Sequence, residues 1–336
     1  MSLFLLRRVA ASLPVLLLVL LIIFGLTRTI PGDPASALLG SDATNEQIAA
    51  LRSQLHLDQP LPVQFVDYLV NVTHGNLGVS LKTGRTVLDE IAERLPATLE
   101  LTMLATLLAL VIGIPLGVWS AVQQGRWVDQ VLRVVSLAGV SMPAFVLALI
   151  LQTLFSIKLG WLPISGRSSP YWVEQPITGL ATVDFLLQGN PAAAWDALVH
   201  LLMPTTVLAV FLASVIGRYV RNSLIEVMGE QFMRAARARG LGERRVVLAH
   251  GLRNALLPAI TVVGLNVAEM LGGAVLTETV FAWPGIGRFM LDAIHNRDYP
   301  VIQGTTLVFA LLYMLVSFLV DVLYGVADPR LRREGQ

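Results

Sequence analysis

The sequence predicts an all-α membrane protein with six transmembrane helices and an extracytoplasmic subdomain between the first two. Of its 336 residues, 55% are hydrophobic and only 14% are charged, whereas roughly 25% are charged in soluble domains. Mean hydropathy is +0.68, and the charges gather in clusters between long apolar runs. A soluble chain of this composition would need an implausibly large core.

Composition also excludes several classes of function. The formal net charge is +1, so no bulk attraction to nucleic acid is expected. The absence of cysteine excludes disulfides, thiolate metal sites and cysteine catalysis. The five histidines are scattered singly, without the paired spacing of a metal site.

No phosphate-binding Gly-x-x-x-x-Gly-Lys-Ser/Thr loop occurs in the sequence, and its only lysines are Lys82 and Lys158. We therefore expect no metal, no cofactor and no catalysis by this chain. If it performs ATP-driven work, the ATP site must lie in a separate protein.

The first span is expected within residues 1–27. Arg7 and Arg8 precede an apolar run over residues 9–27, about the ~20 residues that a helix needs to cross the hydrocarbon core. A signal peptide is the competing interpretation, because Ala35-Ser36-Ala37 resembles a cleavage site, but the run exceeds the usual ~7–15 residue apolar region. We interpret it as an uncleaved anchor, followed by a mixed, polar subdomain over residues 28–97.

Residues 98–336 are predicted to form the membrane core, with Thr98 as the N-cap of its first helix. Fifteen of the 24 basic residues fall on pieces that are cytoplasmic if the N-terminus is inside, which is the usual bias of short loops. Both termini are therefore expected in the cytoplasm. The expected spans are 98–122, 131–157, 201–219, 255–280 and 301–326.

A basic, alanine-rich loop over residues 220–254 is too polar to lie in a membrane. Alanine and arginine favour a helix, and Gly240 is expected to end it. A short cationic helix tied at both ends to membrane spans is well placed to dock into another protein. We expect it to couple the chain to a separate motor.

An alternative role for these arginines is attraction to anionic lipid, worth about 1 kcal/mol for each charge. Lipid anchoring does not require the spacing of the alanines and the glycine. We therefore expect Ala235, Ala236, Ala238 and Gly240 to form the docking surface, with the arginines divided between protein and lipid.

The run Ala235-Ala236-Arg237-Ala238-Arg239-Gly240 resembles the "EAA" cytoplasmic loop of ABC importer permeases, in which such alanines and glycine shape a coupling helix. Two positions depart from the common pattern: Arg234 stands at the glutamate position, and Arg253 stands where many importers have proline. These departures are similar to the dipeptide/oligopeptide branch. The resemblance implies that the ATPase-coupling residues are Arg234, Ala235, Ala236, Arg237, Ala238, Arg239 and Gly240.

Further short motifs, in order along the whole chain, look like the B-type permease of peptide importers. They are Pro31-Gly32-Asp33-Pro34, Gly75-Asn76-Leu77-Gly78-Val79-Ser80, Pro96-Ala97-Thr98-Leu99-Glu100-Leu101, Ser141-Met142-Pro143, Trp161-Leu162-Pro163, Thr277-Glu278-Thr279 with Trp283-Pro284-Gly285, Arg297-Asp298-Tyr299-Pro300, and Asp321 with Asp328-Pro329-Arg330.

The resemblance implies the type I ABC importer permease fold in a bacterial inner (cytoplasmic) membrane. It also implies a second homologous permease, two ABC ATPase subunits and an extracytoplasmic peptide-binding protein as partners. Sister families share these motifs, so nickel complexes, glutathione or opines are alternative substrates.

Glu269 lies about midway along the expected fifth span, and a carboxylate inside a membrane suggests function. Asn266 and Gly273 share its helix face. Two roles are open: this face lines the translocation path and meets a peptide amine, or Glu269 makes an interhelical hydrogen bond. A secondary carrier with Glu269 as the ion-coupling group is a rival class, but the sequence shows no inverted repeat.

Two outer segments are candidates for receiving the binding protein. One contains Gly75, and the other contains Trp283, Pro284 and Gly285. The alternative is that the second segment is simply a turn at the outer membrane interface.

Overall fold

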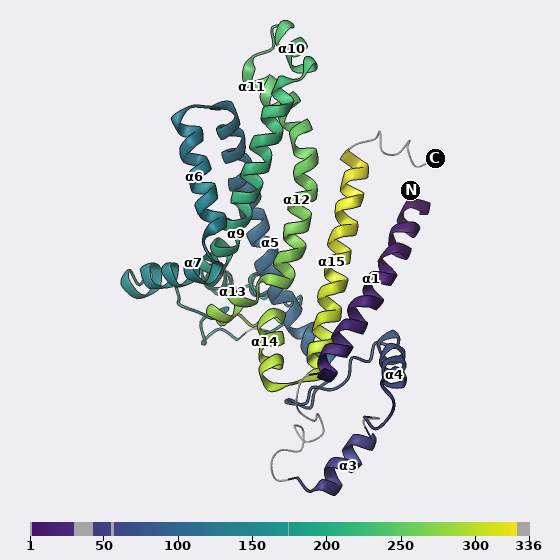
Figure 1. Ribbon diagram of the computed structural model, residues 1–336. Coiled ribbons are helices and arrows are strands. Elements are labelled where there is room, and N and C mark those ends of the chain that lie inside the picture. The colour runs from purple at the N-terminus through teal and green to yellow at the C-terminus, as the bar shows by residue number, and fades with distance from the viewer. Residues whose placement is uncertain (1, 30–42, 55–56, 174, 328–336) are drawn as a thin grey trace. The chain divides into compact units, whose positions relative to one another are not determined.

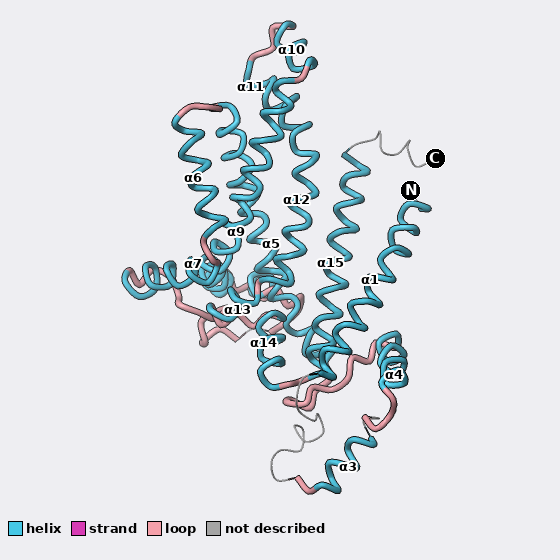
Figure 2. The backbone as a smooth tube through the Cα atoms, in the orientation of Figure 1, coloured by secondary structure: helices cyan, strands magenta, loops and turns pink. Residues whose placement is uncertain are grey.

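The computed structural model describes residues 2–29, 43–54, 57–173 and 175–327, and the regular secondary structure of this part is helical apart from one isolated β-bridge between Val79 and Thr86. Figure 2 shows helices throughout, joined by loops and turns. The expected motif at residues 31–34, the cleavage-like site at 35–37 and the basic tail at 328–336 lie outside the described residues.

The chain forms two compact units. The first comprises Met1–Pro96 and Pro284–Met314, and the second comprises Ala97–Trp283 and Leu315–Gln336. Two long helices, α5 (Val87–Val122) and α15 (Tyr299–Ala327), contribute to both. The other helices of the first unit are α1 (Ser2–Thr29), α3 (Asn45–Gln54), α4 (Leu61–Thr73) and α14 (Ile286–Asn296).

In the first unit, the start of α5 packs against α14 and the start of α15. Val87, Ile91, Ile286 and Ile302 are buried together in this core. Nearby, the Ser80 hydroxyl donates a hydrogen bond of 2.6 Å to the buried carboxylate of Asp298. This contact fixes the turn after residue 75 to the segment that leads into α15.

The second unit is organised around α9 (Pro191–Gly229), a helix of 39 residues. It packs against α6, α8 and α12 (Figure 1). The remaining elements of this unit are α6 (Trp127–Ser141), α7 (Ala144–Leu151), η1 (Gln152–Lys158), α8 (Ala181–Leu187), α10 (Gln231–Ala238), α11 (Glu243–Arg245), η2 (Val246–Gly251), α12 (Leu252–Gly273) and α13 (Val275–Val280), where η1 and η2 are π-helical.

The start of α9 follows the rules of helix capping. The side chain of Asn190 accepts a hydrogen bond of 3.1 Å from the backbone N–H of Ala193. Pro191 occupies the first helical position, where its missing N–H is no loss. From this start, α9 continues without a break through the core of the second unit.

Helices α5 and α9 approach each other closely because glycines line the contact. A Cβ added at Gly113 would lie 2.8 Å from the backbone oxygen of Ala213, and one added at Gly117 would lie 2.6 Å from that of Gly217. Glycines four residues apart let backbones approach in this way in membrane helices. The core formed here also contains Leu212 of α9 and Met270 of α12.

Among the described residues, four helices are long and apolar enough to span a membrane, and the number rises to six if each of two bent pairs is one span. One pair, Trp127–Ser141 and Ala144–Lys158, bends by 101°, and the other, Glu243–Leu256 and Pro258–Gly272, by 53°. From the sequence we expected one continuous transmembrane helix over residues 131–157. Met142 is extended before Pro143, which disfavours helix at the preceding residue and cannot donate a backbone hydrogen bond.

The prediction that Thr98 caps a helix is wrong. Helix α5 begins at Val87, so Thr98 lies inside it. Residues 87–96 form the first part of α5 and belong to the first unit, so the helix starts before the apolar run.

Candidate functional site

A short helical hairpin at one end of α9 carries the predicted coupling residues. Helix α9 ends at Gly229, Glu230 is extended, and α10 follows at once. After α10, Arg239 is the C-cap and Gly240 adopts a φ of +77°. The prediction that Gly240 ends the helix is therefore confirmed, since a left-handed residue of this kind is the common stop of a helix.

The inner face of α10 anchors it to the same chain. Met233 and Ala236 are buried against Val246, and Leu241 and Val227 pack around them. Ala236 was expected on the docking surface, but it is only 8% exposed and lies on this inner face. A docking surface on α10 therefore excludes Ala236.

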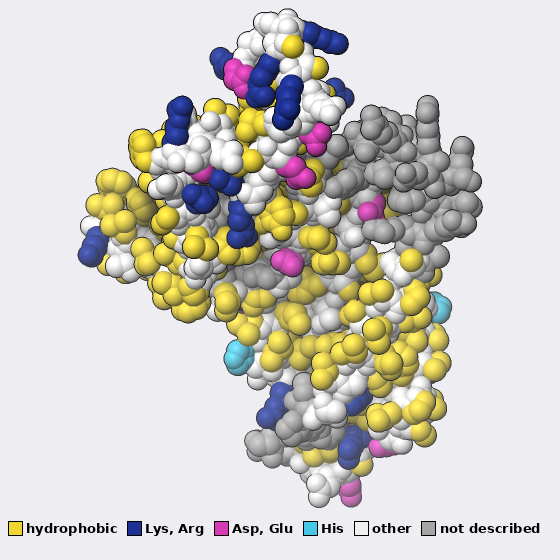
Figure 3. All heavy atoms as spheres, turned by 45° about the horizontal axis from the view of Figure 1, so that its top comes forward, with side chains coloured by type: hydrophobic (Ala, Val, Ile, Leu, Met, Phe, Trp, Pro, Cys, Tyr) yellow, Lys and Arg dark blue, Asp and Glu magenta, His cyan; other side chains and the backbone are white. Residues whose placement is uncertain are grey.

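The outer face of α10 is open. Arg234, Ala235, Arg237, Ala238 and Arg239 are all exposed, as is Gly240. Arg237 is held by Glu243, with a distance of 2.8 Å between Nη2 and Oε1. In Figure 3, basic side chains gather over the end of the second unit that carries α10 and α11. The hairpin thus presents a cationic, alanine-containing surface on a packed base.

The predicted path residues lie on α12. The amide of Asn266 donates to the carbonyl of Val262 in its own helix at 2.7 Å. Glu269 is exposed, and among the described residues it has no hydrogen bond or ion pair. Gly273 is the last residue of the helix. The part of the chain that the structure describes therefore does not supply the interhelical hydrogen bond that was one of the two roles expected for Glu269.

The four docking candidates are divided between the two units. Gly75 and Pro284 are exposed, whereas Gly285 is buried. The side chain of Trp283 is 0% exposed, and its indole N–H donates to the carbonyl of Ala97 at 2.9 Å. Trp283 is therefore packed inside the second unit and offers no exposed surface to a partner, unlike the docking role predicted for it.

The end of the second unit opposite α10 is fastened by buried charges whose pairing the sequence did not predict, although Glu100 and Glu278 belong to the motifs quoted above. Glu100, on α5, accepts hydrogen bonds from the Arg167 guanidinium at 2.6 Å and the Thr182 hydroxyl at 2.6 Å. The hydroxyl of Thr98 donates to Glu278 at 2.7 Å, and both are fully buried. The available signal was an acidic residue inside an apolar run, which is costly unless it is paired.

A buried aspartate fixes the loop before α8. Asp184 accepts hydrogen bonds from the backbone N–H groups of Ile177, Thr178 and Gly179 at 2.8 to 3.0 Å, and from the Thr178 hydroxyl at 2.6 Å. Burial alone would raise the pKa of Asp184. These hydrogen bonds to the charged form outweigh burial and hold its pKa below the ordinary value.

A second ion pair joins α6 to α9 near the α10 hairpin. Arg221 binds Asp129 through two contacts of 2.6 and 2.8 Å, and Asp129 also accepts from the Ser120 hydroxyl at 2.7 Å. Asp129 is only 1% exposed. Removing one partner would leave a buried charge unpaired, so this contact makes α6 and α9 move together.

Comparison with known proteins places this arrangement in a family. Residues 113–333 match the model for "Binding-protein-dependent transport system inner membrane component", and residues 1–102 match the model for the N-terminal part of such membrane components. A solved structure of the MetNI methionine ABC transporter, in inward-facing conformations, has a similar fold. Its TM-score is 0.52 at 18% identity, covering 69% of this chain and 93% of that one.

Curated relatives match over nearly the full length. The di/tripeptide transport system permease protein of Pseudomonas aeruginosa (strain UCBPP-PA14) is 45% identical, covering 98% of this chain and 99% of the relative. The dipeptide transport system permease protein of Escherichia coli (strain K12) is 41% identical with the same coverage. The glutathione transport system permease protein of Salmonella choleraesuis (strain SC-B67) is 39% identical, covering 98% of each chain. The helical fold and these matches show that the chain belongs to the family of binding-protein-dependent transport system inner membrane components.

Proposed function

We propose that this chain is the transmembrane permease subunit of an ATP-driven dipeptide or oligopeptide importer. The observation that carries the proposal is the α10 hairpin, whose inner face is anchored by Met233 and Ala236 while its outer face is open. A surface built in this way transmits force to the helix from which it projects. The relatives whose names specify di- and tripeptides support the substrate class.

In this proposal, α10 docks into one of two ABC ATPase subunits. Ala235, Ala238 and Gly240 give the close approach, and Arg234, Arg237 and Arg239 are divided between the ATPase and anionic lipid. ATP-driven movement of the docked hairpin passes directly into α9, because only Glu230 separates the two helices. The α10 end of the chain and both termini are then cytoplasmic.

The exposed carboxylate of Glu269 supports a path along α12. A charged side chain facing lipid at mid-membrane is costly, so this face of α12 needs a polar surrounding. A second, homologous permease that encloses a water-filled path with this chain would supply it. Asn266, Glu269 and Gly273 then line the path, and Glu269 meets the peptide amine.

An extracytoplasmic binding protein delivers the peptide in this proposal. Gly75 and Pro284, which are exposed, remain the docking candidates, whereas the buried Gly285 does not. Cross-linking from positions 75 and 284 to the binding protein tests this assignment. Absence of a cross-link at both positions would contradict it.

Glutathione is the second candidate substrate, because a glutathione permease is 39% identical over nearly the whole chain. The deciding experiment reconstitutes the chain with its partner permease, both ATPases and the binding protein. Stimulation of ATP hydrolysis is then measured with dipeptides, tripeptides, glutathione and a nickel complex. We expect dipeptides or tripeptides to stimulate hydrolysis, and stimulation by glutathione or the nickel complex alone would overturn the peptide assignment.

A further inference from the structure

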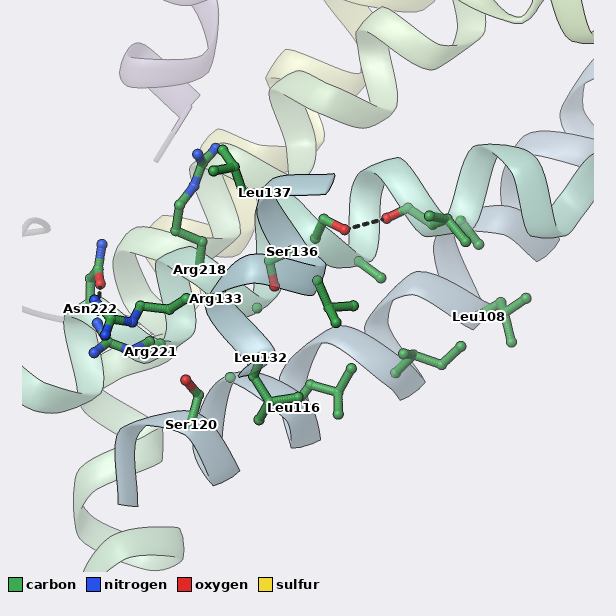
Figure 4. Close-up of a pocket in the computed structure, with 18 of the residues that line it drawn as sticks. Leu108, Leu116, Ser120, Leu132, Arg133, Ser136, Leu137, Arg218, Arg221 and Asn222 are labelled. Carbon is green, nitrogen blue, oxygen red and sulfur yellow. Dashed lines mark hydrogen bonds between the residues drawn. The ribbon is translucent and has the colours of Figure 1, made fainter. Parts of the chain in front are cut away.

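A cavity of about 500 Å³ lies between α5, α6 and α9, apart from the predicted path on α12. Its walls are mostly aliphatic, with Leu108 and Leu116 from α5, Leu132 from α6 and Val210 from α9. Figure 4 shows Leu108 at one end and the side chains of Arg133, Arg218, Arg221 and Asn222 gathered at the other.

The basic end carries more positive charge than its single carboxylate neutralises. Arg221 already occupies both oxygens of Asp129. Arg133 reaches the same carboxylate only at 3.8 Å. Arg218 is exposed and has no hydrogen bond or ion pair with any described residue. Arg133 and Arg218 are thus available to an anion at the mouth of the cavity.

The apolar part of the cavity opens outward. Ile112, Val135 and Leu137, which all line it, are 41%, 57% and 61% exposed. Ile112 lies on α5, which is long and apolar enough to span a membrane, and Val135 and Leu137 lie on α6, which meets that test together with the helix after its bend. We therefore infer that the open side of these residues faces hydrocarbon. A groove with an apolar wall and a basic end matches an amphiphile with an anionic head and a hydrocarbon tail.

We propose that this groove binds one anionic glycerophospholipid, taken from the leaflet at the α10 end of the chain. Arg133 and Arg218 hold the headgroup phosphate, and one acyl chain lies along Leu132, Leu116 and Leu108. The choice of leaflet rests on the proposed function, which makes the α10 end cytoplasmic. The two guanidinium groups attract a net negative charge, so they favour an anionic lipid over a zwitterionic one. The hydrocarbon tails of the two lipids are alike and do not contribute to this preference.

The test measures lipid retention on the assembled importer. The purified complex is equilibrated with equal amounts of phosphatidylglycerol and phosphatidylcholine, and bound lipid is counted by native mass spectrometry. We expect at least a fivefold preference for phosphatidylglycerol, and loss of most of it in the double variant R133Q/R218Q. The matched control is R126Q, because Arg126 is exposed at the same end but does not line the cavity.

A second variant tests the acyl-chain half without changing charge. Ser136 lines the cavity, so S136W should fill the groove and remove the bound lipid. L107W is its control, since Leu107 is 59% exposed on α5 and is not a lining residue.

Three results would overturn the proposal: equal retention in R133Q/R218Q and R126Q, displacement of the lipid by inorganic phosphate alone, or a cross-link from L137C to the partner permease. Peptide-stimulated ATP hydrolysis, measured on the same preparation, reports separately on the proposed function.

Discussion

Gly240 is the residue on which the shape of the coupling hairpin depends. Gly240 has a φ of +77°, a backbone conformation that residues with a side chain adopt only with strain. Space is not the constraint, because no heavy atom lies within 4 Å of a Cβ placed there. The effect of a substitution should therefore follow backbone preference more than bulk. Asparagine tolerates this conformation far better than a β-branched residue does.

We expect G240V to lose most peptide uptake while basal ATP hydrolysis persists, and G240N to keep most uptake. The strain at this position costs roughly 1–2 kcal/mol for a residue that disfavours it. The measurement is uptake per ATP hydrolysed in proteoliposomes. Gly242 is the control, because it also has free space around it but an ordinary φ of −62°. Equal losses in G240V and G242V would refute the backbone argument.

Residues whose conformation depends on local sequence could be predicted, and residues whose burial depends on distant parts of the chain could not. The stop at Gly240 was predictable, since it depends on local conformation alone. The orientation of Ala236 was not, because its burial depends on Val246, which reaches it only after the chain turns back. Trp283 and Ala97 are likewise joined across 186 positions of sequence, and no short pattern reports such a contact.

At the scale of elements, the contact between α5 and α9 leaves no room for a side chain. We expect G117A to lower stability by about 1–3 kcal/mol, because the new methyl group would meet backbone and force the helices apart. The midpoint of thermal unfolding of the purified chain measures this.

G272A is the control for that substitution. Gly272 is also helical but has no heavy atom within 4 Å of an added Cβ, so replacement by alanine should raise stability by up to about 1 kcal/mol. Shifts of the same sign and size in G117A and G272A would contradict a close contact between α5 and α9.

The loop before α8 should depend on pH through Asp184. Its pKa is lowered in the folded chain, so its contribution to stability is present above the ordinary pKa of about 4 and is lost as pH falls through the folded value. We expect the amides of Ile177, Thr178 and Gly179 to stay protected from hydrogen exchange at pH 5 and to lose protection below about pH 4.

The variant D184N should lose part of this protection already at pH 7, whereas D292N, at an exposed aspartate, should behave as wild type. Exchange rates corrected for their intrinsic pH dependence give the comparison. Equal protection of these amides in D184N and wild type at pH 7 would show that Asp184 does not fasten the loop.

The fold was largely predictable because apolar runs of sufficient length specify membrane helices by composition alone. The bend of 101° between Trp127–Ser141 and Ala144–Lys158 was missed, although Pro143 marked it. Proline inside a membrane helix is often tolerated, since neighbouring groups can satisfy the freed carbonyl. Sequence therefore did not distinguish a continuous helix from a broken one.

For the whole molecule, the surroundings of Glu269 distinguish a path from a lipid-facing surface. The chain contains no cysteine, so a single introduced cysteine can be labelled without background. We expect E269C in the assembled importer to react with a membrane-impermeant thiol reagent, because water reaches the path. Leu107 is 59% exposed on α5, a helix apolar enough to span a membrane, so we expect L107C to face lipid and stay unreacted. Similar reactivity at both positions would contradict a path along α12.

The length of helix α9 bears on how its two ends communicate. Its 39 residues extend roughly 58 Å at ~1.5 Å per residue, which exceeds the ~30 Å of a hydrocarbon core. Asp196, near its start, accepts two hydrogen bonds of 2.7 Å from Ser169 in the loop that precedes α8. Its other end leads into α10.

A single continuous helix is thus long enough to reach both faces of a membrane, and equilibrium linkage requires that any coupling along it be reciprocal. If docking of a binding protein at one end of α9 tightens the grip of the ATPase at the other, then the ATPase must tighten docking of the binding protein by the same factor.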